Sequence, residues 1–269
     1  MNDLCAVKWY RPVLFVIALS MAGCSDPFDL HPWEVDVPAE LKALHATTIP
    51  RIQGAVDGLD TFRFAVVGDP QLYYEELDEI LDAVEAKGDI RFVIVAGDLT
   101  DQGLAQEFIW YAEVAHGRSI PVLSIIGNHD HLGSGRVIFE HLFGPRDFTF
   151  QAGGVRFICF DNVEFENELP VQYDELERQL EVPFQGPTIF LAHIFPGDVQ
   201  LNGPPGQRFE EIMLSHPVNA AFMGHLHGYA VGTLPGGTPW ATAPWVRGDA
   251  FLEVSVRPDT VTHRLISLP

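Results

Sequence analysis

Positive charge is scarce in this sequence of 269 residues. Sixteen Lys and Arg residues stand against 37 Asp and Glu, which gives a formal net charge of −21 at pH 7. A surface this acidic repels the phosphate backbone of nucleic acids over long distances. We therefore expect no nucleic-acid polymer among the partners. Hydrophobic residues still make up 47% of the chain, which is enough for one sizeable core.

Long apolar runs are also missing. The longest covers residues 13–23, eleven residues, whereas a membrane-spanning helix needs roughly 20. Lys8 and Arg11 precede this run, and the small residues Ala22 and Gly23 end it. A positive flank, a short apolar core and small residues are typical of a secretory signal peptide. We predict a signal peptide over residues 1–23.

Cysteines are few, and one of them follows this segment directly. The sequence Ser-Met-Ala-Gly-Cys at residues 20–24 resembles the processing box of bacterial lipoproteins, with Met21 where Leu is usual. The resemblance implies cleavage before Cys24 and lipid on its thiol and amino groups, which would anchor the domain stably to a membrane. The alternative is ordinary secretion with an incidental Cys24. Cleavage would leave Cys159 as the one other cysteine, so we expect no intramolecular disulfide.

The residue after the lipidation site bears on the choice of membrane. Ser25 stands where an Asp would resemble the inner-membrane retention signal of enteric bacteria. We therefore expect a bacterial outer-membrane lipoprotein whose domain lies outside the cytoplasm.

The rest of the chain divides at about residue 60. Residues 24–60 contain four prolines, which predicts an extended tether with one short helix over residues 39–45. Residues 61–269 alternate short apolar runs with amphipathic stretches, as successive βα units do. The predicted strands are 62–67, 91–96, 121–126, 155–160, 187–192 and 218–223, and the predicted helices are 74–87, 103–117, 134–142, 170–181 and 207–215.

The last 40 or so residues lack helical patterns and alternate strands with Gly and Pro turns. We expect an α/β fold in a single domain, with a two-layer central β-sandwich flanked by helices.

Five of the apolar runs end in a small residue followed by a polar side chain that can bind a metal ion. In α/β sheets, ligands gather outside the carboxyl ends of the strands. Spacings of 29 residues between the first two of these polar groups and 30 to the third match the length of a βαβ step. The groups are Asp69, Asp98, Asn128, His193, and the pair His225 and His227.

The glycine before most of these groups permits a sharp turn out of its strand. One Gly-Asp pair alone would more often mark a plain turn. Five such ends in series supply carboxylate, amide and imidazole donors, a mixed oxygen and nitrogen set that suits Mn, Fe, Zn or Ni. The series therefore favours a transition-metal site.

The order of these motifs resembles the calcineurin-like metallophosphoesterase superfamily over residues 62–230. The segments that carry the resemblance are Asp69-Pro70-Gln71, Gly97-Asp98-Leu99-Thr100-Asp101, Gly127-Asn128-His129-Asp130, His193 and Gly224-His225-Leu226-His227.

The resemblance implies a binuclear centre of two divalent transition metal ions. Asp98 would bridge both ions. Asp69 and His227 would complete one site, and the other site would be completed by Asn128, His193 and His225. A bridging water, as hydroxide, would attack a phosphate monoester or diester.

Gln71 departs from the pattern, because the family usually has His there. Its amide oxygen can still ligate, but more weakly than an imidazole. A Gln71 side chain that points into solvent is the alternative.

His129 matches the family position that stabilises or protonates the leaving oxygen, with Asp101 orienting its imidazole. The alternative is a structural bond from His129 to Asp98 or Asp101. We expect Asp130 to support the loop. Protein Ser/Thr phosphatases of this superfamily place Arg where this chain has Gln102, which disfavours that branch.

Substrate contacts are harder to read from sequence. Arg136 and Arg208 are the cations in this region that could grip a second phosphate, and a solvated role is the alternative for both. His131 lies close enough in sequence to touch substrate, whereas the other histidines are expected on the surface or in loops. Trp240 and Trp245 are expected to pack.

These patterns together predict a metal-dependent phosphoesterase that acts on a small phosphorylated substrate outside the cytoplasm. The alternative is a non-catalytic lipoprotein that binds metal or a phosphorylated ligand.

Overall fold

The computed structural model describes residues 34–268, so the predicted signal peptide, Cys24 and the start of the predicted tether lie outside the described residues. Strand β1 (Phe62–Val67) shows why this sequence forms two layers of sheet. Phe62, Phe64 and Val66 join the core between the sheets, whereas Ala65 and Val67 join the core beneath the helices. Successive side chains of a strand point to opposite faces, so an unbroken apolar run fills both cores.

The first sheet has the strand order β11-β10-β1-β2-β3. Strands β1, β2 and β3 are parallel, and β10 and β11 join antiparallel at the edge. The bounds of the other four strands are β2 (Ile90–Val95), β3 (Val122–Ser124), β10 (Ala250–Arg257) and β11 (Thr260–Ser267).

The second sheet has the order β4-β5-β6-β7-β9-β8. Strands β5, β6, β7 and β9 are parallel, while β4 and β8 run antiparallel at the two edges. The bounds are β4 (Phe148–Ala152), β5 (Val155–Cys159), β6 (Thr188–Leu191), β7 (Ala220–Met223), β8 (Val231–Thr233) and β9 (Pro239–Thr242).

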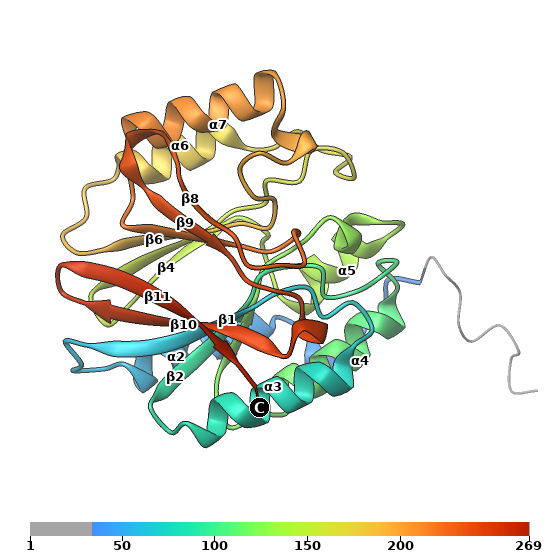
Figure 1. Ribbon diagram of the computed structural model, residues 1–269. Helices are drawn as coiled ribbons and strands as arrows, with labels where there is room; N and C mark the ends of the chain where they lie inside the picture. Colours follow the sequence, from blue (N-terminus) through green and yellow to red (C-terminus); the bar gives the residue numbers. More distant parts are fainter. Residues whose placement is uncertain (1–33, 269) are drawn as a thin grey trace, which may run out of the picture. The chain divides into compact units, whose positions relative to one another are not determined.

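Helices cover the outer faces of both sheets (Figure 1). On the first sheet lie α3 (Tyr74–Ala86), α4 (Ala105–His116) and α5 (Gly135–Leu142). On the second lie α6 (Tyr173–Glu181) and α7 (Pro204–Ser215). Five short 3-10 turns lie at η1 (Ala39–Leu41), η2 (His129–His131), η3 (Val199–Leu201), η4 (Pro235–Gly237) and η5 (Val246–Gly248).

The predicted α/β architecture, two central sheets with flanking helices, is confirmed. The inter-sheet core is rich in phenylalanine, with Phe64 stacked on Phe92 and Phe157 set edge-on to both rings. Aromatic pairs of this kind add to the stabilisation from burial alone. Among the described residues, no helix combines the length and hydrophobicity needed to cross a membrane.

The segment before residue 60 differs from the predicted tether. Helix α2 (Leu44–Ala55) buries Leu44, Thr48 and Ile52, and it packs against β2, β3 and β4. These three residues are spaced four apart, so they share one face of the helix. Pro50 lies inside this helix, although an internal proline usually breaks one. Burial of the apolar face outweighs that cost.

One helix begins earlier than predicted, and one strand was not predicted. Strand β4 alternates Phe148 and Phe150 before a Gly153-Gly154 turn, which is a hairpin signal. Helix α7 begins at Pro204, earlier than predicted, because proline is well tolerated in the first turn of a helix.

Candidate active site

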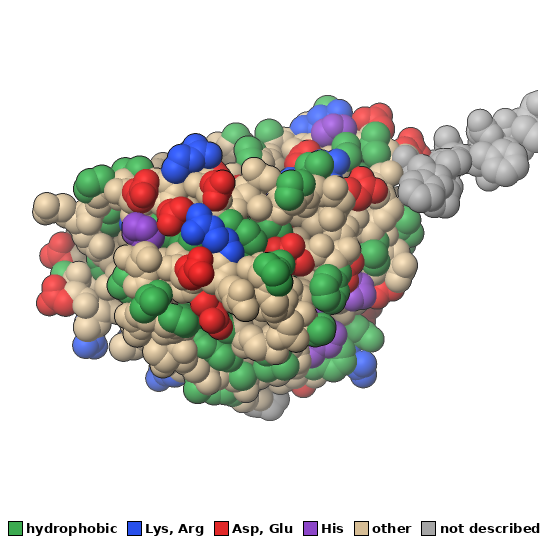
Figure 2. Space-filling view, turned by 90° about the horizontal axis from the view of Figure 1, so that it is seen from above, with side chains coloured by type: hydrophobic (Ala, Val, Ile, Leu, Met, Phe, Trp, Pro, Cys, Tyr) green, Lys and Arg blue, Asp and Glu red, His purple; other side chains and the backbone are tan. Residues whose placement is uncertain are grey.

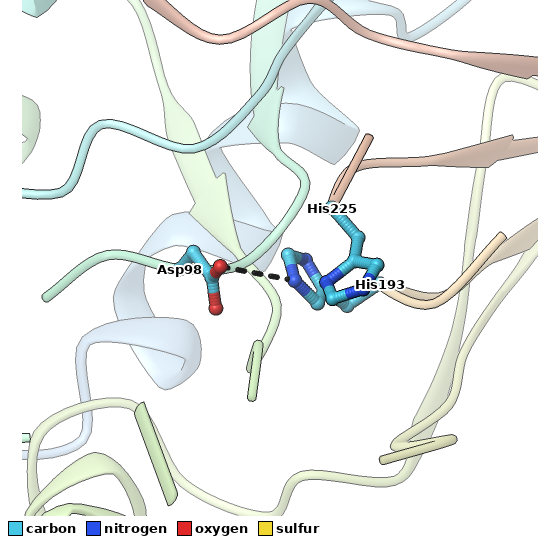
Figure 3. Close-up of side chains that lie close together, drawn as sticks. All are labelled: Asp98, His193 and His225. Atoms are coloured by element: carbon cyan, nitrogen blue, oxygen red, sulfur yellow. Dashed lines mark ion pairs between the residues drawn. The ribbon is translucent and has the colours of Figure 1, made fainter. Parts of the chain in front are cut away.

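The polar groups predicted from the strand ends meet at one end of the sandwich. Their donor atoms form two groups, each with all atoms within 4.8 Å of one another. One group contains Asp69, Asp98 and His227, and the other contains Asp98, His193 and His225. Asp98 belongs to both groups. Figure 3 shows it facing the imidazoles of His193 and His225.

Asp98 follows β2 and is 1% exposed. Its Oδ1 accepts the backbone N–H of His129 at 2.9 Å, and its Oδ2 accepts Gln71 Nε2 at 2.8 Å. Burial would raise the pKa of this carboxyl, but the neighbouring His193 outweighs burial and lowers it. Asp98 is thus held as a carboxylate at the centre of the site.

His193 follows β6 and is fully buried. Its Nδ1 donates to the carbonyl of Ala96 at 2.7 Å, which fixes the ring so that Nε2 faces Asp98 Oδ2 at 3.2 Å. Burial would lower the pKa of His193, yet the carboxylates of Asp98 and Asp69 raise it to about 10. The site therefore holds a strongly negative potential, which suits a cation.

Asn128 follows β3 and joins the second group of donors. Its Oδ1 lies 3.1 Å from His193 Nε2 and 2.9 Å from His225 Nδ1. Its amide nitrogen donates to Glu166 Oε1 at 3.2 Å, which directs Oδ1 toward the two imidazoles. On the other side of its ring, His225 Nε2 lies 3.2 Å from Asp198 Oδ2.

The sequence patterns did not assign Glu166 or Asp198 as the side chains that orient Asn128 and His225. Outer partners of this kind fix the ring and amide orientation of metal ligands. The signal that could have been used is the position of Asp198, in the loop directly after the strand that ends in His193. No comparable signal marks Glu166.

Asp69 is fully buried after β1, and its Oδ1 accepts the backbone N–H of His225 at 3.0 Å. Its Oδ2 is buried without a hydrogen-bond partner among the described residues. Burial raises the pKa of Asp69 to about 7. A buried carboxylate oxygen that lacks a partner is costly unless it binds a cation.

Gln71 is 8% exposed and lies inside the site. Besides the bond to the Asp98 side chain, its backbone N–H donates to the carbonyl of Asp98 at 3.1 Å. The side chain therefore does not point into solvent.

His227 lies at the more open side of the site. Its ring stacks on Trp245, with centroids 4.8 Å apart and an interplanar angle of 9°. Burial lowers the pKa of His227, which favours the neutral imidazole that binds metals. Trp240 instead packs against the core beneath α6 and α7, beside Phe195, with 6.4 Å between the ring centroids.

His129 and Asp101 are brought together, but not through the Asp101 side chain. His129 Nδ1 donates to the backbone carbonyl of Asp101 at 2.7 Å, whereas the nearest carboxylate oxygen of Asp101 is 3.8 Å away. The predicted orientation of the ring by Asp101 therefore comes from its main chain. Burial would lower the pKa of His129, but the Asp98 carboxylate outweighs it and raises that pKa.

Asp130 supports the loops, as predicted. Its carboxylate accepts the backbone N–H groups of Leu99, Thr100 and Gly127 at 2.9–3.1 Å. This one side chain ties the loop after β2 to the loop after β3.

The backbone around the site is strained. Within residues 34–268, eight non-glycine residues have positive φ, and six of them lie in the site loops: Asp69, Gln71, Leu72, Asp98, His225 and His227. Such conformations cluster at functional sites, where the surrounding structure holds them in place. At Gly127, a Cβ would lie 2.1 Å from the backbone nitrogen of Asp98. Only glycine allows the two loops to approach this closely.

The side chains of all three residues predicted to contact substrate interact instead with other residues of the protein. Arg136 lies 3.4 Å from Glu140, and Arg208 donates to Asp174 and Glu177 on α6. The face over α6 and α7 mixes acidic and basic side chains rather than presenting a positive patch (Figure 2). His131 is not a loop residue open to substrate, because its side chain is 1% exposed and lies 3.1 Å from Asp161.

Solved structures with this fold include several phosphatases. The chain superposes on a dimetal phosphatase from Danio rerio with a TM-score of 0.59 and 14% identity, covering 76% of this chain and 95% of that one. It superposes on the purple acid phosphatase PPD1 of yellow lupin with a TM-score of 0.58 and 16% identity, covering 76% of this chain and 51% of that one. This chain thus spans about half the length of the lupin enzyme.

The same fold occurs in GAP50, the anchor in the inner membrane complex of Plasmodium. That match has a TM-score of 0.58 and 11% identity, and it covers 77% of this chain and 84% of GAP50. At these identities the likeness shows a common fold and does not show a common activity.

Sequence comparison identifies the family of the segment that carries the site loops. No curated protein sequence matches this chain significantly. Residues 62–229, however, match the family described as calcineurin-like phosphoesterase, and this span contains all of the strand-end donors as well as His129 and Asp101. This chain belongs to the calcineurin-like phosphoesterase family.

Proposed function

We propose that this protein hydrolyses a phosphate monoester or diester at a centre of two divalent transition metal ions. The observation that carries the proposal is the pair of donor groups that share the Asp98 carboxylate. A carboxylate shared by both donor groups could hold two neighbouring cations, and a pair of neighbouring cations is what two-metal phosphatases use.

The residues of the site fit such ions. The buried Asp69 Oδ2 lacks a partner among the described residues, and the Asp98 carboxylate of the same donor group is 1% exposed. Two buried carboxylates in one donor group carry negative charge that a cation would compensate. Oxygen and imidazole nitrogen donors together suit Mn, Fe, Zn or Ni.

Each ion would have its own ligands besides Asp98. Asp69 and His227 would hold one ion, with the Gln71 amide beside it. Asn128, His193 and His225 would hold the other. When bound, two such cations act as Lewis acids that polarise phosphoryl oxygens and lower the pKa of a water.

The chain itself supplies proton transfer and orientation. His129 is one-third exposed beside the donors, and its Nδ1 is fixed by the Asp101 carbonyl, so Nε2 is directed away from that carbonyl. We assign His129 to donate a proton to the departing oxygen of the ester. The nearby Asp98 carboxylate favours the protonated ring that this role needs.

The test is turnover of p-nitrophenyl phosphate and bis(p-nitrophenyl) phosphate with Mn²⁺, together with a metal count on protein purified without chelator. We expect about two ions per chain, turnover that chelator abolishes, and a loss of at least about 100-fold in Asp98→Ala and His225→Ala. Asp174→Ala, an exposed acid on α6, is the matched control. Turnover unchanged by both site variants and by chelation would overturn the proposal. Two bound ions without turnover on any phosphoester would instead identify a binding protein.

We also propose that the protein works outside the cytoplasm, anchored to a bacterial membrane, through lipid on Cys24. The support is the sequence of residues 1–25, which lies outside the described residues. The substrate would then be a small phosphorylated molecule of the exported space, and the outer membrane is the proposed location.

A further inference from the structure

Arg247 lies on η5, two residues after Trp245, and aromatic rings hold its side chain. Its guanidinium lies 4.8 Å from the ring centre of Tyr73 and 5.1 Å from that of Trp245. One of its nitrogens donates to the Tyr73 hydroxyl at 3.3 Å. Cation–π contacts hold the guanidinium in place without neutralising its charge.

The backbone fixes this arrangement beside the donors. Trp245 stacks on His227 and forms a β-bridge with Gly68, the residue before Asp69. The Gly68 N–H also donates to the Pro244 carbonyl at 3.2 Å. A Cβ at Gly68 would lie 2.7 Å from the Ala243 carbonyl oxygen, so the two segments are in direct contact. The loop that carries Arg247 is therefore anchored to the strand end that supplies Asp69.

Arg247 differs from the cations that the sequence suggested. Arg136 and Arg208 pair with carboxylates, whereas Arg247 forms no ion pair with any carboxylate in residues 34–268. The side chain is exposed, so its remaining N–H groups can reach a ligand. What sets Arg247 apart from the other arginines is its contact with Trp245, which stacks on the candidate ligand His227.

We propose that Arg247, held against Tyr73 and Trp245, binds a second phosphate of the substrate, next to the phosphoryl group at the metal centre. This assignment rests on the proposed function. A guanidinium presents two parallel N–H groups that match two phosphate oxygens, and a charge-assisted pair of this kind is stronger than a neutral hydrogen bond. The preferred substrates would then carry two phosphates, as diphosphates do.

Binding can be measured without turnover. The probes are methylenediphosphonate, which carries two phosphonate groups and resists hydrolysis, and methylphosphonate, which carries one. Titration calorimetry on the Mn²⁺-loaded protein gives both dissociation constants. We expect Arg247→Gln to weaken methylenediphosphonate binding about tenfold or more, and at least five times more than it weakens methylphosphonate binding. Arg247→Lys should fall between wild type and Arg247→Gln, because it keeps the charge but loses the fork.

The control variant is Arg91→Gln, which removes another exposed arginine, on β2. It should bind both probes as wild type does. Equal weakening of both probes by Arg247→Gln, or no weakening, would overturn the assignment. Turnover on pyrophosphate and p-nitrophenyl phosphate separates the two proposals. If neither compound is hydrolysed but the probes still respond to Arg247, the subsite stands and the proposed hydrolysis fails.

Discussion

The ring of His129 receives its orientation from a main-chain atom, and this changes what mutation of Asp101 should do. The bond from Nδ1 goes to the Asp101 carbonyl, which any residue at position 101 can provide. We therefore expect Asp101→Ala to reduce kcat less than about tenfold, whereas His129→Ala should reduce it about 10²–10⁴-fold. Steady-state kinetics on p-nitrophenyl phosphate compares the two variants. Equal, large losses would show that the Asp101 carboxylate itself orients the ring.

Substitutions of Gln71 test how far one neutral ligand lowers the metal affinity of the proposed site. The side chain is buried against Asp98, and an amide oxygen is a weaker ligand than an imidazole for these metals. We expect Gln71→His to tighten one ion and keep or raise turnover. Gln71→Leu should deplete one ion and depress turnover strongly. Metal counts during stepwise dialysis against chelator measure both effects. If both variants retain wild-type metal content and rate, Gln71 is not a ligand.

At the scale of elements, Asp198, at the N-terminus of η3, orients His225 from outside the donor groups. Asp198 faces His225 Nε2, and its Oδ1 also accepts the backbone N–H of Gln200 at 2.8 Å. Asp198→Asn removes the charge that orients the imidazole, so we expect metal affinity to fall about 10–100-fold. Competition with a chromogenic chelator gives that affinity. Asp174→Asn is the matched control, and an affinity equal to wild type in Asp198→Asn would rule out this role.

Helix α2 carries a buried histidine that should make stability depend on pH. His45 packs among Phe139, Phe143 and Phe148, and burial, followed by the nearby His116, lowers its pKa to about 3. The folded protein keeps His45 neutral, while the unfolded chain protonates it below its ordinary pKa of 6.5. Stability is therefore complete above pH 6.5 and is lost as the pH falls toward 3.

The variant His45→Phe should weaken this dependence. Between pH 6.5 and 4.5, wild type should lose about 2–3 kcal/mol of unfolding free energy more than the variant does. Urea unfolding at several pH values measures the difference. Parallel pH profiles for wild type and His45→Phe would contradict the shifted pKa.

The sequence predicts those elements and site residues whose pattern lies within a short segment, and it does not predict those that depend on contacts with distant segments. The strands that end in Asp69 and Asp98 were predictable because buried parallel strands are continuous apolar runs with donors at their ends. Helix α2 was missed because Pro50 is a local signal against a helix, while the favourable burial of Ile52 comes from distant strands. Arg247 was not predicted because it lies 20 residues after His227 in the sequence. Only the folded loop sets it against Trp245, the residue that stacks on His227.

At the scale of the whole molecule, the acidic net charge and the buried carboxylates of the candidate site both repel anions. A net charge of −21 disfavours the approach of anionic substrates at low salt. Bound cations and Arg247 would then be the local positive groups that receive a phosphate. Such a protein gains from being held close to its substrate, because confinement raises the local concentration without any added positive surface.

The proposed lipid anchor provides this confinement, and it can be tested on the full chain. Lipid on Cys24 would hold the protein on a membrane through several acyl chains, since one chain alone binds only reversibly. We expect wild type to sediment with membranes and Cys24→Ser to appear in the soluble exported fraction. Labelling with a radioactive fatty acid should mark wild type and not the variant. Cys159→Ser is the matched control, because that thiol is buried in β5 and should not affect location. Equal amounts of wild type and Cys24→Ser in the membrane fraction would contradict the anchor.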